Sequence, residues 1–143
     1  IGIGYTLPFE TFAAEWIDAD ALKDELDSYR LPGTAFRTIH YKPIAGSSQG
    51  KLIHGVQYFF TDYSAACISL TQFYVMQALH RLYPGRDPFK MAAGRTAMFD
   101  KICGTDYVRK TFSKMLEVSD IVDYWNKDVE DFRTLSSKYH LYK

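Results

Sequence analysis

The sequence has two cysteines, no net charge and no apolar run long enough to cross a bilayer, and each of these features excludes a class of protein. Lysine plus arginine and aspartate plus glutamate both total 17, without a cluster of basic residues of the kind that neutralises phosphates. This balance argues against a nucleic-acid partner. A spanning helix needs roughly 20 consecutive apolar residues, so we expect no transmembrane segment in this chain.

Metal-binding patterns are absent as well. The four histidines show neither the H-x-x-x-H nor the H-x-H spacing that places two imidazoles on one metal. His40 and His54 fall in two expected strands and could face each other, which favours a hydrogen-bonded pair, with a zinc site as the alternative. Cys67 and Cys103 have apolar neighbours, where cysteine usually serves as a small hydrophobic side chain. We therefore expect no metal and no disulfide framework.

Two catalytic patterns are incomplete or missing. The run Gly46-Ser47-Ser48-Gln49-Gly50 has the spacing of a G-x-S-x-G nucleophile elbow, but it lies in a loop without the strand-to-helix scaffold that such an elbow requires, so a serine nucleophile is unsupported. Residues 2–10 contain two glycines of the G-x-G-x-x-G dinucleotide fingerprint but lack the third. Glycines in such a loop still let the backbone approach a ligand or another domain, with Tyr5, Thr6 and Glu10 offering polar atoms beside it. The alternative is a structural loop in which Thr6 and Glu10 only satisfy backbone N–H groups.

The length and the 47% hydrophobic content suit one core, so we expect a single domain over residues 1–143. Residues 1–17 are typical of a strand end, at Ile1-Gly2-Ile3-Gly4, followed by an irregular segment. Asp18 then caps a helix that ends at Pro32-Gly33. The core positions of that helix are Leu22, Leu26 and Tyr29.

Two extended runs follow, at residues 34–41 and 52–61, around a loop dense in turn-forming residues. The second run is apolar on both faces, which indicates a central strand. Gln57 is conspicuous among its apolar neighbours. Among the carboxylates near turns, Glu10, Glu15 and Asp62 are more typical of caps and loop anchors than of acid or base catalysts.

The remainder of the sequence is helical in pattern. A long apolar helix is expected over residues 64–82, and a short one over residues 98–103 ending at Gly104. Thr105 can cap another helix, and Ser119 can cap a last one with apolar positions up to Leu135. We therefore expect an α+β (mixed α/β) fold, with a small central sheet, helices packed on it and a helical C-terminal half.

Several short blocks occur in a characteristic order along nearly the whole chain. They are Gly-x-Gly-x-Thr-x-Pro-Phe-Glu at residues 2–10, Trp16-Ile17-Asp18, Leu31-Pro32-Gly33, Gly55-Val56-Gln57, Thr61-Asp62, Phe99-Asp100-Lys101, Gly104-Thr105-Asp106 and Tyr139-x-Leu141-Tyr142. Together they resemble the C-terminal domain of the bacterial exo-β-N-acetylmuramidases, a glycoside hydrolase family formerly described as a domain of unknown function. The Pro-Phe-Glu and Gly-Val-Gln blocks are the most specific parts of this resemblance.

The resemblance implies a two-domain enzyme. A Rossmann-like N-terminal domain would carry the catalytic glutamates, and the present chain, which starts at Ile1 without a methionine, would be the C-terminal domain that closes one side of the cleft. Such enzymes remove terminal N-acetylmuramic acid from peptidoglycan fragments without a metal or nucleotide cofactor. The resemblance also implies a periplasmic or extracellular location, and a chain that is inactive without its catalytic partner domain.

A muramyl sugar presents a carboxylate, an acetamido group and hydroxyls, which call for a few fixed polar groups in a shaped pocket. By the resemblance, the candidate substrate-binding residues are Tyr5, Thr6, Glu10 and Gln57. Tyr5 could stack on a sugar face, Gln57 could bond the acetamide or a hydroxyl, and Glu10 could orient hydroxyls or a positive partner group. The alternative function is a non-catalytic structural or peptidoglycan-binding module.

Overall fold

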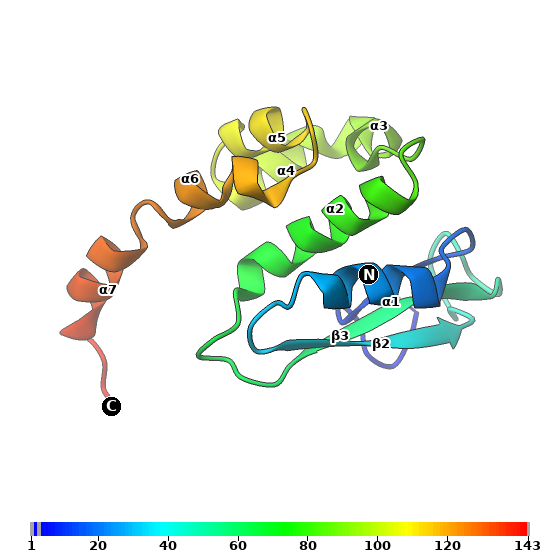
Figure 1. The fold of residues 1–143 in the computed structure, drawn as a ribbon, viewed down its shortest axis with the longest axis horizontal. Helices are drawn as coiled ribbons and strands as arrows, with labels where there is room; N and C mark the ends of the chain where they lie inside the picture. Colours follow the sequence, from blue (N-terminus) through cyan, green and yellow to red (C-terminus); the bar gives the residue numbers. More distant parts are fainter. Residues whose placement is uncertain (1, 3, 143) are drawn as a thin grey trace. The chain divides into compact units, whose positions relative to one another are not determined.

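The structure is a computed structural model that describes Gly2 and residues 4–142 (Figure 1). Its contacts divide the chain into two compact units, Ile1–Asp87 and Pro88–Lys143, and each unit is described by itself below. The strand end expected at the first four residues falls partly on Ile1 and Ile3, which lie outside the described residues. The single domain over the whole chain stays a prediction, because compact units need not fold separately.

The first unit contains a three-stranded antiparallel sheet. Its strands are β1 (Thr11–Ala14), β2 (Thr34–Tyr41) and β3 (Ile53–Phe60), in the order β1-β3-β2. The prediction that the second extended run forms a central strand is thus confirmed. β1 was expected to be irregular, and that expectation is wrong. Four residues are too few to show a strand period, and this strand exists through its pairing with β3.

Helix α1 (Ala19–Ser28) begins at the predicted cap. The Asp18 carboxylate accepts from the backbone N–H groups of Asp20 and Ala21 at 3.0 and 3.1 Å. These bonds satisfy two of the donors that the first turn of a helix leaves free. Leu22 and Leu26 are fully buried, so the apolar face predicted from their spacing is confirmed.

The long helix begins later than expected. The structure has a short 3₁₀ turn, η1 (Ile68–Leu70), followed by α2 (Thr71–Leu82), whereas the sequence pattern placed the start at residue 64. The Asp62 carboxylate accepts from the backbone N–H and hydroxyl of Ser64 at 2.8 and 2.6 Å. Asp62 is therefore a cap, as expected, but it closes a turn before the helix.

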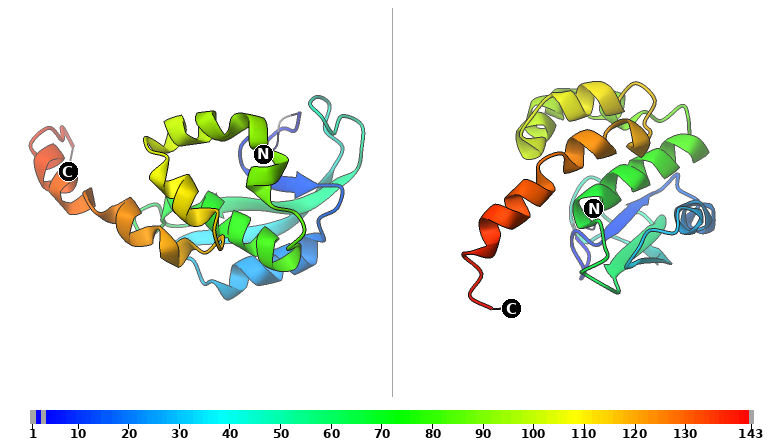
Figure 2. Two further views of the ribbon diagram at one scale, coloured as in Figure 1. Left: turned by 90° about the horizontal axis from the view of Figure 1, so that it is seen from above. Right: turned by 60° about the vertical axis from the view of Figure 1, so that its left-hand side comes forward.

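The two faces of the sheet differ in what covers them. Figure 2 shows the sheet with helices α1 and α2 from two further sides. One core cluster joins α1 and α2 to one face, and its buried members are Ile17, Leu22, Leu26, Phe36, Val56, Val75 and Ala78. On the other face, a smaller cluster joins Ile39, Tyr41 and Ile53 to Tyr5 and Ala13. The residues that precede β1 thus pack on the face that α1 and α2 leave uncovered.

The second unit is a series of short helices. These are α3 (Pro88–Met91), η2 (Ala93–Arg95), α4 (Thr96–Cys103), α5 (Tyr107–Phe112), η3 (Val118–Asp120), α6 (Val122–Asn126) and α7 (Val129–Ser137). Gly104 ends α4 in the left-handed conformation with φ of 71°, as its position predicted. The Thr105 hydroxyl accepts from the backbone N–H of Tyr107 at 3.1 Å, but the N-cap residue of α5 is Asp106, one residue after the predicted cap.

The single last helix expected after Ser119 is wrong. That segment forms three pieces, with Ser119 inside η3 and Ile121 leaving helical geometry at φ of −120° before α6 begins. Apolar spacing predicts a helical face but does not reveal such local breaks. The mixed α+β class, the small sheet and the helical C-terminal half are nevertheless confirmed. Of the helices in the described part of the chain, none is long and apolar enough to cross a membrane.

Candidate functional site

A row of three polar side chains crosses the sheet at Gln57. The register of the strands places Gln57 of β3 opposite Thr11 of β1 and Arg37 of β2. The side-chain oxygen Oε1 of Gln57 accepts from Nε of Arg37 at 2.8 Å, and its Nε2 donates to Oε2 of Glu10 at 3.0 Å. We call Glu10, Gln57 and Arg37 the polar row.

The two charged ends of the row explain how the amide is oriented. Gln57 is only 5% exposed, and a buried amide without partners would be costly. Its oxygen faces the cation of Arg37 and its nitrogen faces the anion of Glu10, so both hydrogen bonds are charge-assisted. Arg37 and Glu10 themselves are exposed. The row therefore holds one positive and one negative group at the two ends of an immobilised amide.

The segment before β1 is anchored to β3 beside this row. Tyr58 donates its backbone N–H to the Glu10 carbonyl at 3.0 Å and its hydroxyl to the Phe9 carbonyl at 2.6 Å. Phe9 has a φ of 68°, a conformation that is uncommon outside glycine and that is often found at functional sites. Burial raises the pKa of Tyr58, and the charge of Glu10 raises it further, so the phenol stays a donor.

Tyr5 and Thr6 lie on the same N-terminal segment but relate to the row differently. The ring of Tyr5 packs on Tyr41 with centroids 4.2 Å apart, and the Tyr41 hydroxyl lies 3.0 Å from the Thr11 hydroxyl. Thr11 is the register partner of Gln57, so Tyr5 is connected to the row through two intervening side chains. Thr6 is exposed on the loop. The structure thus joins Glu10 to Gln57 directly and Tyr5 to them indirectly.

Arg37 is the member of the row that sequence reasoning missed. Its signal is a charged side chain in the middle of an extended run otherwise rich in apolar and aromatic residues. An arginine at such a position is ordinarily taken as a solvated strand residue. Only the pairing of β2 with β3 shows that it lies beside Gln57.

A pocket of about 370 Å³ is lined by Phe9 and Tyr58, which neighbour the polar row in the sequence, but Tyr58 packs on the face of the sheet that α1 and α2 cover. Phe12 and Tyr58 line it with ring centroids 5.6 Å apart. The remaining lining residues are Ile68, Ser69, Thr71 and Gln72. Aromatic rings with a few hydroxyl and amide groups form the kind of lining that binds small polar ligands.

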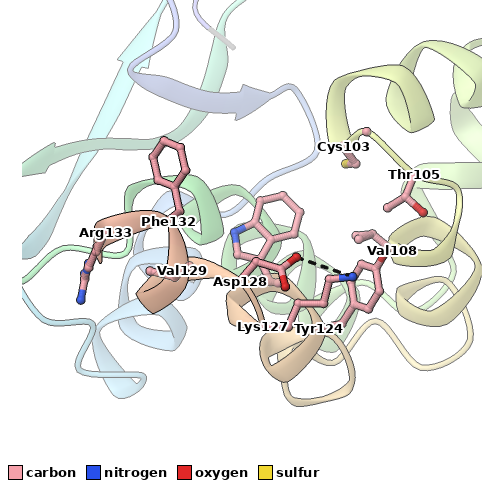
Figure 3. A pocket seen from close by; sticks show the side chains of 11 residues that line it. Cys103, Thr105, Val108, Tyr124, Lys127, Asp128, Val129, Phe132 and Arg133 are labelled. Carbon is pink, nitrogen blue, oxygen red and sulfur yellow. Dashed lines mark ion pairs between the residues drawn. The ribbon is translucent and has the colours of Figure 1, made fainter. Parts of the chain in front are cut away.

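The second unit has a larger pocket of about 690 Å³, drawn in Figure 3. Lys127 lies 4.5 Å from the centre of the Tyr124 ring and 3.7 Å from the Asp128 carboxylate, the pair marked by a dashed line. Phe132 and Arg133 of α7 also line it. None of these residues is a candidate in the sequence, which predicts only a helix with apolar positions in this segment.

The two strand histidines form the expected pair. Nδ1 of His40 lies 2.7 Å from Nδ1 of His54, and the two residues are register partners. Among the described residues, no group of three or more potential ligands could hold a metal ion. Both cysteines are free, and Cys67 is exposed, so its expected role as a buried hydrophobic side chain is wrong. The carboxylate of Glu15 pairs with Lys51 at 2.9 Å, consistent with a loop anchor.

This fold recurs in a solved structure of much greater length. The crystal structure of a DUF1343 family protein from Bacteroides fragilis NCTC 9343 superimposes with a TM-score of 0.94 and 45% sequence identity, over 99% of this chain and 37% of that one. The fold therefore defines this chain as a domain of the kind found within a longer DUF1343 family protein.

The family follows from the sequence comparison. Residues 1–142 match the model described as "Exo-beta-N-acetylmuramidase NamZ, C-terminal", and the chain belongs to this family. It is also 33% identical over 141 residues to the peptidoglycan β-N-acetylmuramidase NamZ of Bacillus subtilis strain 168. That alignment covers 99% of this chain and 33% of the relative, so the chain spans about a third of the curated relative's length. The resemblance inferred from the short sequence blocks is confirmed.

Proposed function

We propose that this chain forms one wall of the substrate cleft of a peptidoglycan-degrading exo-β-N-acetylmuramidase and helps to bind terminal N-acetylmuramic acid. Membership of the NamZ C-terminal family supports the class of enzyme. The observation that carries the role in binding is the polar row, in which buried Gln57 holds Glu10 and Arg37 on the face of the sheet opposite α1 and α2.

The polar row has the groups that a muramyl sugar requires. The side-chain amide of Gln57 has two N–H groups and two acceptor lone pairs. One N–H donates to Glu10, and one lone pair accepts from Arg37. The second N–H and the second lone pair of Gln57 would bond the acetamido group or a hydroxyl of the sugar. The Glu10 carboxylate would accept from sugar hydroxyls, and Thr6 would add a hydroxyl from the loop. Tyr5, packed on Tyr41, would offer its ring to a sugar face.

The chemistry itself would reside in an N-terminal catalytic domain that is Rossmann-like. The relatives are about three times as long as this chain, which leaves room for such a domain. Helix α7 and the turn after it offer a surface for it. Phe132 and Leu135 lie at helical spacing on α7, Tyr139 follows in the turn, and the three side chains are 67%, 56% and 70% exposed. We place the complete protein in the periplasm or outside the cell, where its peptidoglycan substrate lies, and cell fractionation would test that location.

A second candidate function is a structural or peptidoglycan-binding module without a part in catalysis. The observation in its favour is that Gln57 is almost wholly buried and bonded at both ends, as a purely structural glutamine would be. In that case Glu10 and Gln57 would only fasten the N-terminal segment to the sheet.

Hydrolysis of a chromogenic N-acetylmuramic acid glycoside tests the proposal. We expect the full-length protein to be active, this chain alone to be inactive, and Glu10→Ala and Gln57→Ala in the full-length protein to lose at least about tenfold in kcat/KM. Activity of the chain alone would contradict a cleft shared between domains. Full activity of both folded variants would favour the structural module, and an inactive full-length protein would reject the enzyme.

A further inference from the structure

In the function proposed above, Arg37 only bonds to Gln57 and has no ligand of its own. Arg37 is exposed, yet its guanidinium is fixed in place because Nε donates to buried Gln57 at 2.8 Å. We propose that Arg37 is a carboxylate-binding residue, and that its ligand is the lactyl carboxylate of a muramyl sugar. The identity of this ligand rests on the proposed function.

The hydrogen-bonding capacity of Arg37 supports this role. A guanidinium carries five N–H groups, and only the one on Nε is given to Gln57, which leaves the four on the two Nη atoms for an anion. No carboxylate within the described part of the chain forms an ion pair with Arg37. The side chain thus keeps its charge and the planar fork that carboxylates bind.

The position of Glu10 explains why that charge stays available. Glu10 is the carboxylate of the row, but it bonds to the nitrogen of Gln57 while Arg37 bonds to the oxygen. The amide therefore stands between the two charges and prevents the direct pair that would neutralise Arg37. Because the buried amide holds the fork before any ligand arrives, less conformational entropy is lost on binding.

The same arrangement selects the kind of anion. A phosphate dianion near Arg37 would also meet the negative charge of Glu10, which opposes its binding. A ligand with one carboxylate and neighbouring hydroxyl or amide N–H donors satisfies both ends of the row, since its donors can bond to Glu10. A muramyl sugar is such a ligand, whereas the same sugar without its lactyl group has no carboxylate to offer Arg37.

The test compares two substrates in the full-length protein. One is the chromogenic N-acetylmuramic acid glycoside, and the other is its methyl ester, in which the lactyl carboxylate is neutral. The main variant is Arg37→Gln, which removes the charge but can still donate to Gln57, and Arg37→Lys keeps the charge without the planar fork. Lys42→Met is the matched control, since Lys42 is an exposed cation just beyond the end of β2.

We expect Arg37→Gln to raise KM for the acid by about 10- to 100-fold with little change in kcat, and to leave the methyl ester unaffected. Arg37→Lys should give a smaller rise, and Lys42→Met should match the wild type. An equal loss on the acid and the ester would show that Arg37 is structural. No change on either substrate would also overturn the proposal.

A separate measurement distinguishes this proposal from the proposed enzyme. If the wild type hydrolyses neither substrate, the proposed enzymatic activity is rejected. The role of Arg37 is then tested by calorimetric binding of free N-acetylmuramic acid and its methyl ester. Binding of the acid at least about tenfold tighter than the ester, with the difference abolished by Arg37→Gln, would support a carboxylate site. Equal binding of the two, or binding of neither, would overturn it.

Discussion

Nε of Arg37 on β2 donates to Oε1 of Gln57 on β3 at 2.8 Å, across a register pair at the centre of the sheet. If the amide nitrogen of Gln57 were hydrated, this bond would only link two neighbouring strands. Here that nitrogen donates to Glu10, so one buried side chain of β3 connects the segment before β1 to strand β2. The effect of replacing Gln57 depends on this connection.

The first prediction separates function from stability at Gln57. Gln57→Leu replaces the buried amide with an apolar side chain of similar size, and both former partners are exposed and can be hydrated. We therefore expect the free energy of unfolding to change by less than about 1 kcal/mol, while kcat/KM on the muramic acid glycoside falls at least about tenfold. Denaturant unfolding and steady-state kinetics of the full-length protein measure the two effects.

The matched control for that substitution is Gln49→Leu, because Gln49 is exposed in the loop between β2 and β3. It should change neither stability nor kinetics. A large loss of stability in Gln57→Leu with unchanged kcat/KM in the remaining folded protein would show that the polar row is structural.

The second prediction concerns close packing between β1 and β3 at Gly55. A Cβ added there would lie 2.0 Å from the carbonyl oxygen of Phe12, a backbone atom of the paired strand. Gly55→Ala must therefore push β1 away from β3 or shift both, at a cost on the order of 1–3 kcal/mol or more. Thermal unfolding should show a clear fall in Tm, whereas Gly85→Ala, with no atom near its added Cβ, should have almost no effect. Equal Tm values for the two variants would contradict this account.

The third prediction is a pH dependence in the second unit. Nε and Nη2 of Arg109 donate to the two carboxylate oxygens of Asp100 at 2.7 and 2.8 Å. The hydrogen bond to Arg109 lowers the pKa of Asp100 below its ordinary value of 3.8. A carboxylate with a lowered pKa in the folded state stabilises the fold above the unfolded pKa, and this stabilisation is lost as the pH falls through the folded pKa.

Asp100→Asn should accordingly lower Tm at pH 7, and the gap from the wild type should close as the pH is lowered below about 3.8. Asp123→Asn, which removes an exposed carboxylate from α6, should show no such gap. A gap that is independent of pH would mean that Asp100 acts through packing or through a neutral hydrogen bond.

The fourth prediction concerns the exposed apolar face of α7. If this face packs against the proposed catalytic domain, Phe132→Asp places a charge in a buried interface and should destabilise the full-length protein by at least about 2–3 kcal/mol. Asp131→Ala is the control, because Asp131 is an exposed neighbour on the same helix. If Phe132 stays in water in the complete protein, both substitutions should change the free energy of unfolding by less than about 0.5 kcal/mol.

Local chemistry was a reliable guide where one or two residues decide the outcome. The carboxylate of Asp18 caps α1, Gly104 ends α4 in the left-handed conformation, and the apolar faces of the second extended run identify β3 as the central strand. The order of short blocks along the chain was sufficient for the family. Each of these features depends on neighbours in the sequence or on the chain's own pattern.

Features that depend on distant partners were not predictable in the same way. β1 is a strand because its four residues pair with β3, and the last helical segment is broken where Ile121 leaves helical geometry. The family resemblance and their isolated polarity indicate Glu10 and Gln57 as candidates, but their contact joins residues 47 positions apart.

The sequence by itself therefore determined the fold class, most of the element types, the family and two members of the polar row. The tertiary structure alone decided that Arg37 belongs to that row and that Gln57 separates it from Glu10. The physical reason is that strand register is set by side-chain packing and backbone hydrogen bonding between distant segments, so a residue's partner across a sheet is not specified by its own neighbours.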